Sequence, residues 1–376
     1  MAQPAHSRIG PVQPFTGPAL WYGPDLAGRE DWVVRLTAHH RDEQRAALRT
    51  ARARGTTLLR MTRDDFPLPD LSAELEHAAA QLRAGRGFVL IRGLPVDGLG
   101  DTDASTVLRG VGQYLGRPVP QTADGRTLCH IREADPREDS LRPPPYRTRA
   151  GLPLHTDESD LLGLLCLRPA RSGGRTVLAS AAAVHNTMLA ARPDFTRRLY
   201  DTYFFAQFEE KDVPGERSYL GAPLITRHGT RASMRYDRER LEAGEALLQD
   251  GRRTGPPDAD RELFDLVDAT AASPAVRLDL DLRAGDLLLV DNHVVLHGRT
   301  PFEDHPEPGS KRHLLRLWLA RQEAPPAPDG PAERHGAPHT RVGIPPRDVI
   351  RPRPLRPAHT SLRRSGRPRP TPGPPA

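Results

Sequence analysis

Apolar residues in the first third of the chain recur with the spacing of amphipathic helices. In residues 70–83, Leu71, Leu75, Ala78 and Leu82 fall on one face of a helix. Asp70 or Ser72 would cap that helix, since a side-chain oxygen at this position accepts a hydrogen bond from a free backbone N–H. The pattern predicts further helical segments at residues 31–54, 104–114, 186–200 and about 238–270.

Short apolar runs between glycine, proline and charged residues predict β-strands. The run at 88–91 is wholly apolar and reads as a buried strand. Other strands are expected at 127–131, 161–167, 175–183, 222–226, 231–236, 276–280, 287–291, 294–296 and 312–319. They are separated by turns and helical insertions without a regular β-α-β alternation. We therefore expect a mainly β fold with helical insertions, an antiparallel barrel or sandwich of the jelly-roll type.

Composition divides the chain into three parts. Residues 1–30 are rich in glycine and proline, and they are expected to form an arm over the domain that Trp21 and Tyr22 anchor. Residues 31–320 carry all the periodic segments and are expected to form one domain. Residues 321–376 are dominated by proline, arginine, alanine and glycine, a composition that cannot bury a core, and are expected to be a disordered tail.

The basic charge of the chain belongs to the tail. Residues 321–376 contain 11 arginines and four acidic residues, which leaves a net charge of about −1 for residues 1–320. All basic residues except Lys211 and Lys311 are arginines, a skew typical of a GC-rich genome. The nearly neutral body offers no groove that would follow a nucleic-acid backbone.

Several features favour a cytoplasmic protein. No apolar run is long enough to span a membrane, and the first residues lack a basic segment followed by an apolar one. The two cysteines, Cys129 and Cys166, do not suggest a disulfide framework, and Cys166 lies in an apolar run where core packing is expected.

One tripeptide suggests a metal site. His155 and Asp157 are two positions apart, so on an extended strand both side chains point to the same face. An imidazole and a carboxylate side by side are two of the three ligands of the facial triad that holds non-haem Fe(II). A polar turn also fits these residues. The polar, proline-rich stretch before them, within residues 124–149, is interpreted as a lid over the site.

A second histidine is needed to complete such a triad. His297 ends an apolar stretch and is followed by Gly298, which suits a side chain at the mouth of a barrel. His293, four residues earlier, has the same strand parity, so spacing alone does not choose between the two. A structural role in a turn or in strand pairing is favoured for Asn292 and His293.

Two arginines near the end of the body share a strand face. Arg312 and Arg316 alternate with apolar residues, and an arginine inside a barrel is costly unless it meets a carboxylate. A dicarboxylate cosubstrate would supply one.

Two other residues each allow two roles. His130 would line the substrate pocket or be a buried, hydrogen-bonded histidine. Arg299 would brace the metal-site loop or form a surface salt bridge.

These segments together resemble the TauD/TfdA-like family of Fe(II)- and 2-oxoglutarate-dependent dioxygenases, in the clavaminate synthase-like and gamma-butyrobetaine hydroxylase-like superfamily. The resemblance covers roughly residues 32–320. It rests on five motifs in the family's order: His155-Thr156-Asp157, Gly173-Gly174-Arg175-Thr176, Gly285-Asp286-Leu287, His297-Gly298-Arg299-Thr300 and Arg312-His313-Leu314-Leu315-Arg316.

The resemblance implies a fold and a set of cofactors. The fold would be a double-stranded β-helix, a cupin-like jelly-roll core flanked by helices. Iron would be held by His155, Asp157 and His297. The carboxylate of 2-oxoglutarate would be bound by Arg312 with help from Thr176, and Arg316 would contact the cosubstrate or an anionic substrate. Which of the two arginines holds 2-oxoglutarate stays open.

The resemblance also implies a reaction. Fe(II), 2-oxoglutarate and O2 would oxidise an unactivated C–H bond of a small, anionic or amino-acid-like substrate, with succinate and CO2 as co-products. Halogenating relatives lack the carboxylate that matches Asp157, so its presence here favours hydroxylation or desaturation. Two alternatives are a non-catalytic, cupin-like binding barrel and a nucleic-acid-directed dioxygenase that uses the basic tail.

Overall fold

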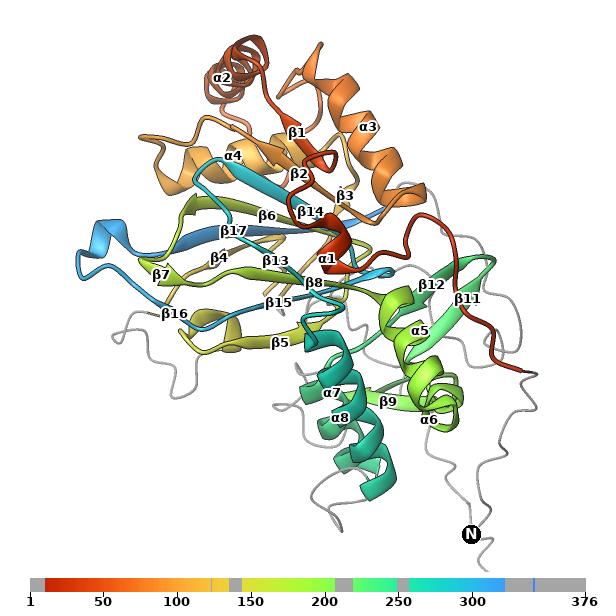
Figure 1. The fold of residues 1–376 in the computed structure, drawn as a ribbon. Helices are drawn as coiled ribbons and strands as arrows, with labels where there is room; N and C mark the ends of the chain where they lie inside the picture. The colour runs from red at the N-terminus through yellow and green to blue at the C-terminus, as the bar shows by residue number, and fades with distance from the viewer. Residues whose placement is uncertain are drawn as a thin grey trace, which may run out of the picture.

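Two β-sheets lie face to face, and helices cover the outer side of each (Figure 1). The computed structural model describes residues 11–122, 124–134, 144–206, 219–248, 257–321 and 341. The larger sheet has seven strands in the order β1-β2-β14-β6-β17-β3, with β4 also paired to β17. These strands are β1 Val33–Arg35, β2 Phe88–Arg92, β3 Arg117–Pro118, β4 Leu128–Ile131, β6 Leu161–Arg168, β14 Asp286–Asp291 and β17 His313–Ala320.

The smaller sheet carries the chemistry described below. Its four strands follow the order β13-β8-β15-β5, all antiparallel, with β5 at the edge. They are β5 Leu152–His155, β8 Thr176–Ser180, β13 Leu278–Leu280 and β15 Val295–Arg299. Three two-stranded ribbons complete the β-structure of the described residues: β7 Ser172–Gly173 with β16 Phe302–Glu303, β9 Thr202–Ala206 with β10 Tyr219–Pro223, and β11 Ile225–His228 with β12 Arg231–Met234.

Alternation along the strands builds three apolar layers. On β17, Leu314 and Trp318 point between the two sheets, whereas Leu315 and Leu317 point to the opposite face. The inner layer also contains Leu178 from the smaller sheet. Because side chains of successive residues project to opposite faces, one strand can serve both layers. Arg316 shares the parity of Leu314 and Trp318, so it points inward.

Helices pack on both outer faces of the pair of sheets. Three cover the larger sheet: α2 Ala38–Arg54, α3 Leu71–Ala84 and α4 Asp101–Gly112. Three lie behind the smaller sheet: α5 Ala181–Ala191, α6 Pro193–Arg198 and α8 Asp258–Ala272. Two others are α7 Arg238–Leu248, which packs on β9, and the short α1 Gly23–Leu26.

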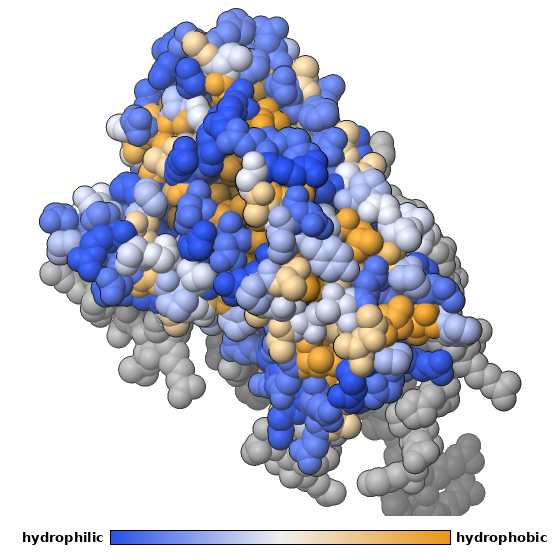
Figure 2. All heavy atoms as spheres, in the orientation of Figure 1, coloured by the Kyte–Doolittle hydropathy of each residue, from blue (hydrophilic) through white to orange (hydrophobic). Residues whose placement is uncertain are grey.

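Hydrophilic residues dominate the face seen in Figure 2, and apolar ones form separate patches between them. None of the helices in the described ranges is long and apolar enough to cross a membrane.

The described part of the N-terminal arm is tied to the body at two aromatic residues. The Trp21 indole N–H donates to the Arg86 carbonyl at 2.9 Å, and its ring meets Phe88 edge-on. The backbone of Phe15 exchanges two hydrogen bonds with the Asn186 amide, at 2.8 and 2.9 Å. The Phe15 contact ties the arm to helix α5 behind the smaller sheet, and the Trp21 contact ties it to the start of β2 in the larger sheet.

Several sequence predictions need correction. Neither Asp70 nor Ser72 caps α3 through its side chain, and the Ser72 hydroxyl donates to the Pro69 carbonyl instead. The strand predicted at 222–226 is divided between β10 and β11. The helix predicted at 31–54 begins only at Ala38, because Val33–Arg35 pairs with β2 as a parallel strand. The strand predicted at 175–183 ends at Ser180, whose hydroxyl caps helix α5. Pro193 splits the helix predicted at 186–200 into α5 and α6. The helical segment predicted at 238–270 forms two helices, and residues 249–256 between them lie outside the described ranges.

Candidate active site

Two histidines face each other across neighbouring strands of the smaller sheet. His297 on β15 pairs in register with His155 at the end of β5. Their ring centroids are 4.4 Å apart. The sheet therefore brings together two imidazoles that are far apart in sequence.

Asp157 lies just beyond β5 and turns its carboxylate between the two imidazoles. Its Oδ1 is 3.7 Å from Nε2 of His155, and its Oδ2 is 3.5 Å from Nε2 of His297. One donor atom from each residue lies within 4.8 Å of the others, as a shared metal ion requires. The three residues form the arrangement of a 2-His-1-carboxylate site.

Surrounding groups fix the orientation of these side chains. The His155 Nδ1–H donates to the Pro153 carbonyl at 2.9 Å, which leaves the lone pair on Nε2 to face Asp157. The Trp318 indole N–H donates to Asp157 Oδ2 at 2.8 Å. The sequence analysis missed Trp318, although its position two residues after Arg316 on one strand places both on the same face.

The electrostatics favour the ionisation states that bind metals. Burial by itself would raise the pKa of Asp157, but Arg316 and His297 outweigh it and hold this pKa below the usual range. Arg316 Nη1 lies 3.6 Å from Asp157 Oδ1. Burial lowers the pKa of His297, which keeps its imidazole neutral. An ionised carboxylate beside a neutral imidazole is a suitable donor set for a divalent cation.

The loop after Asp157 is braced by the turn between β14 and β15. The Asn292 side-chain oxygen accepts from the Asp157 backbone N–H at 3.3 Å, and its amide donates to the Ser159 carbonyl at 2.9 Å. The His293 Nε2–H donates to Asp160 at 2.8 Å, and its Nδ1 lies 2.9 Å from the Ser233 hydroxyl. His293 therefore has a structural environment outside the triad. The same-face expectation for His293 and His297 is wrong, because residues 292–294 form a turn and β15 begins at Val295.

One residue of the C-terminal segment lies against the back of this loop. Arg341 is 4% exposed, and its guanidinium donates to the carbonyls of Asp157 (3.0 Å), Asn292 (3.2 Å) and Met234 (2.6 Å). Its backbone N–H donates to Asp160 at 2.8 Å. The rest of the predicted tail lies outside the described residues, apart from Arg321, and composition gave no signal for this contact.

A second cationic group lies at the far end of β15. The guanidinium groups of Arg299 and Arg312 lie 4.9 and 5.1 Å from the centroid of the Phe302 ring. Both side chains are buried, and Arg312 Nη1 and Arg299 Nε and Nη1 have no hydrogen-bond partner among the described residues. Arg299 Nη2 donates to the carbonyls of Thr148 and Ala150, so the predicted surface salt bridge is wrong and the bracing role fits. Thr176 is buried and pairs in register with Arg299.

Arg316, which lies beside Asp157, is held by Gln121. Its Nε donates to the Gln121 side-chain oxygen at 2.7 Å, and the Gln121 amide donates to the carbonyls of Thr127 and Arg316. The guanidinium lies 5.0 Å from the centroid of the Tyr146 ring. Tyr146 belongs to the stretch interpreted as a lid, of which residues 135–143 lie outside the described part of the chain.

Two minor expectations concern residues away from the triad. Cys129 and Ile131 point between the sheets, so His130 on the same strand points to the helix side and does not line the pocket. The alternative expectation was a buried, hydrogen-bonded histidine: its 2.9 Å contact with His313 fits the hydrogen bond, but the side chain is only partly buried. Cys166 is buried in the core, and burial raises the pKa of its thiol to about 12. The core-packing expectation for Cys166 is therefore confirmed.

Comparisons with known proteins agree with this geometry. Residues 37–318 match the family described as "Taurine catabolism dioxygenase TauD, TfdA family". The chain belongs to the TauD/TfdA family. FR-33289 synthase from Streptomyces rubellomurinus is 30% identical over 311 residues, which cover 82% of this chain and 90% of that protein. Taurine hydroxylase-like protein SAT17 from Stachybotrys chartarum is 30% identical over 305 residues, covering 79% and 77% of the two chains.

A solved structure shares the fold of this TauD/TfdA member. Asparagine oxygenase in complex with Fe(II), 2S,3S-3-hydroxyasparagine and succinate superposes with a TM-score of 0.57 at 21% identity, over 77% of this chain and 93% of that one. The predicted jelly-roll core flanked by helices is confirmed. The protein is a 2-oxoglutarate-dependent non-haem iron dioxygenase, and Fe(II), 2-oxoglutarate and O2 are its cofactor and cosubstrates. These findings support the enzyme over the non-catalytic barrel.

The described residues fit these groups. The triad offers two imidazoles and one carboxylate, the ligand types that Fe(II) takes in this class of oxygenase. The unpartnered guanidinium nitrogens of Arg299 and Arg312 fit a carboxylate, because a buried donor without an acceptor costs free energy.

Proposed function

We propose that this enzyme hydroxylates, or desaturates, an unactivated C–H bond of a small, anionic, amino-acid-like substrate. The observation that carries the proposal is the convergence of His155, Asp157 and His297, with one donor atom from each within 4.8 Å of the others. Two separate arginine groups, Arg316 beside Asp157 and the Arg299–Arg312 pair, accompany them. In this proposal those three residues hold the iron. Each arginine group then serves a different anion.

The Arg299–Arg312 pair is assigned to 2-oxoglutarate. Arg312 is the more deeply buried member of the two arginines that the sequence left open, and its Nη1 has no partner within the described ranges. A carboxylate in a bidentate or single charge-assisted hydrogen bond would satisfy it. Arg299 adds a second positive charge on the same phenyl ring, and Thr176 is assigned to support the carboxylate through its hydroxyl.

Arg316 is assigned to the substrate. It lies beside Asp157, and its contact with Tyr146 brings it under the stretch interpreted as a lid. The amino acid asparagine and the amino sulfonic acid taurine, named in two of the similar proteins, both carry an acidic group. An arginine held rigidly by Gln121 suits such a group, because a fixed donor loses little entropy when it binds.

When bound, the iron with 2-oxoglutarate and O2 supplies the oxidant for the C–H bond, and succinate and CO2 are released. The protein's own residues bind, orient and exclude water. Trp318 and Pro153 hold the ligands in position, and Arg316 places the substrate against the triad. Asp157 fills the position that halogenating relatives leave free, so oxygenation or desaturation is the proposed outcome.

A cytoplasmic location and a small-molecule partner complete the proposal. The two cysteines are both unpaired and buried, in keeping with a reducing compartment. Nucleic acid is not the proposed substrate, because the two described arginines of the C-terminal segment, Arg321 and Arg341, are engaged with groups of the body. The oligomeric state is left open.

An anaerobic titration tests the proposal. Fe(II) and 2-oxoglutarate are added to the full-length protein, and the visible absorption band of the chelate is followed. Succinate release is then measured in air with a panel of amino acids, amino sulfonates and their uncharged amides. We expect the band to form and the acids to stimulate succinate release. Stimulation by the amides alone would overturn the assignment of an anionic substrate, and absence of the band would overturn the iron site.

A further inference from the structure

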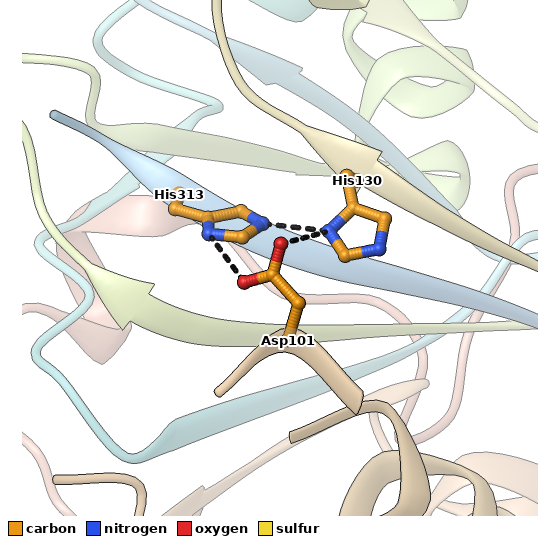
Figure 3. Close-up of side chains that lie close together, drawn as sticks. All are labelled: Asp101, His130 and His313. Carbon is orange, nitrogen blue, oxygen red and sulfur yellow. Dashed lines mark hydrogen bonds and ion pairs between the residues drawn. The ribbon is translucent and has the colours of Figure 1, made fainter. Parts of the chain in front are cut away.

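A second group of metal-binding residues lies on the opposite face of the larger sheet. Asp101 is the first residue of α4, His130 lies on β4 and His313 begins β17. Figure 3 shows the two imidazoles side by side with the Asp101 carboxylate turned toward both. The three residues come from distant parts of the chain, and strand pairing and helix packing bring them together.

The three side chains lie close enough together to share one ion. His130 Nδ1 and His313 Nε2 are 2.9 Å apart, about the separation of two neighbouring ligands that are each ~2 Å from one ion. The Asp101 oxygens lie 3.8 Å from His130 Nδ1 and 3.8 Å from His313 Nδ1, too far for hydrogen bonds. One donor atom from each of the three residues lies within 4.8 Å of the others.

We propose that Asp101, His130 and His313 bind one divalent transition-metal ion of the zinc type, which ties helix α4 to strands β4 and β17. Two imidazoles and one carboxylate are preferred ligands of zinc and its neighbours in the first transition series. This site is separate from the triad of His155, Asp157 and His297. It would leave the fourth ligand position to water.

The two imidazoles are wholly or partly buried, whereas the Asp101 carboxylate remains accessible to solvent. The His313 side chain is fully buried and the His130 side chain is 33% exposed, whereas that of Asp101 is 49% exposed and gives an entry from solvent. Burial also lowers the pKa of both imidazoles.

Arg168 and Arg132 contact the proposed ligands, and these contacts must change when the ion binds. Arg168 Nη2 donates to His313 Nδ1 at 3.1 Å, so His313 Nε2 carries the proton and donates to His130. When the ion takes Nε2, this proton moves to Nδ1, and Arg168 keeps its bond from Nε to the Lys311 carbonyl. Arg132 lies 3.3 Å from Asp101 and competes with the ion for that carboxylate. The measured zinc affinity will therefore be the free energy of binding the ion minus that of the hydrogen bonds and the ion pair that it replaces.

Zinc stoichiometry of the full-length, metal-stripped protein tests the proposal. Equilibrium dialysis against buffered free zinc, with metal counted by mass spectrometry, should give two ions per chain, since zinc also occupies the facial triad. Asp101→Asn and His130→Ala should each lose one ion. His297→Ala should lose the other, and His297→Ala combined with Asp101→Asn should bind none.

A matched control separates a built site from surface histidine binding. His39 and Asp70 form an exposed pair 2.6 Å apart, so His39→Ala should keep both ions. Cobalt added to the His297→Ala variant should give a visible d–d spectrum that Asp101→Asn abolishes. If Asp101→Asn and His130→Ala remain folded by circular dichroism and still bind two zinc ions, the second site does not exist. If instead His297→Ala keeps two, the facial triad is the assignment that fails.

Discussion

His297 and His155 occupy directly opposed positions on two antiparallel strands, 142 residues apart in sequence and 4.4 Å apart between ring centroids. This pairing favours His297 over His293 as the proposed third ligand, two histidines that spacing left equivalent. His297→Ala should abolish iron binding and succinate formation, because it removes one of three ligands. Iron content after anaerobic loading is the measurement. His293→Gln is the control and should retain iron, and retained iron in His297→Ala would show that the distal ligand has been misplaced.

Arg312 should control the requirement for 2-oxoglutarate. Arg312→Ala removes a charge-assisted hydrogen bond, which typically contributes about 1.5–3 kcal/mol, so the 2-oxoglutarate KM should rise roughly ten- to hundredfold. Arg316→Ala is the comparison and should raise the KM of the primary substrate instead. The opposite pattern would mean that the two arginines exchange roles.

Trp318 should contribute to metal affinity without touching the metal. Trp318→Phe keeps the ring but loses the N–H that donates to Asp157 at 2.8 Å. Loss of such an orienting contact typically weakens metal binding by about 10–100-fold. Trp21→Phe is the matched control, because it also loses a buried N–H donor, to the Arg86 carbonyl, but far from the triad. Equal Fe(II) affinities in both variants would contradict the orienting role.

Arg341 should stabilise the fold through the loop that carries Asp157. Arg341→Ala leaves three buried carbonyls without their donor and should lower the free energy of unfolding by about 3 kcal/mol. Urea unfolding gives the measurement. Arg45→Ala, which removes an exposed arginine paired with Asp42, should change stability by less than about 0.5 kcal/mol. Similar small effects in both variants would show that the contact contributes nothing in solution.

His185 should make the protein sensitive to acid. Burial lowers its pKa to about 4 from an ordinary 6.5, with Tyr200 and Asn186 as hydrogen-bond partners. Between those values the unfolded chain binds the proton and the folded chain does not, so stability falls as pH falls from 6.5 to 4. The loss should reach roughly 2–3 kcal/mol. His185→Gln should reduce the pH dependence in that window by this amount, and an unchanged slope would contradict the assignment.

The sequence predicted those helices and strands whose apolar pattern lies within the element itself. The apolar face of residues 70–83 and the alternation of residues 312–319 predicted α3 (Leu71–Ala84) and β17 (His313–Ala320) closely. Helix starts were also marked, because Thr37 and Ser180 are capping residues whose hydroxyls accept from a backbone N–H three positions later. These two capping residues mark the start of α2 and the end of β8, the two boundaries that the apolar pattern placed wrongly.

Contacts between distant segments were not predictable in the same way. The strand Val33–Arg35 forms by pairing with Phe88–Arg92. The sequence around residues 33–35 contains no pattern that predicts this partner. The contact of Arg341 with the Asp157 loop spans 184 residues and comes from a segment whose composition suggested disorder. The resemblance supplied the site residues, and the structure supplied their orienting partners Trp318, Gln121 and Asn292.

Within the described part of the chain, the strand that ends in His155 pairs with a single neighbour. β5 is the edge of the smaller sheet, and its pairing with β15 is limited to the stretch between Leu152 and His155. In the proposed iron site, His155 and Asp157 lie on or just after this strand, and His297 lies on β15, the strand paired with it. A metal ion would therefore act as a cross-link between the two strands. Its removal would loosen the edge of the sheet together with the catalytic centre, so amide hydrogen exchange in Leu152–His155 would report metal occupancy directly.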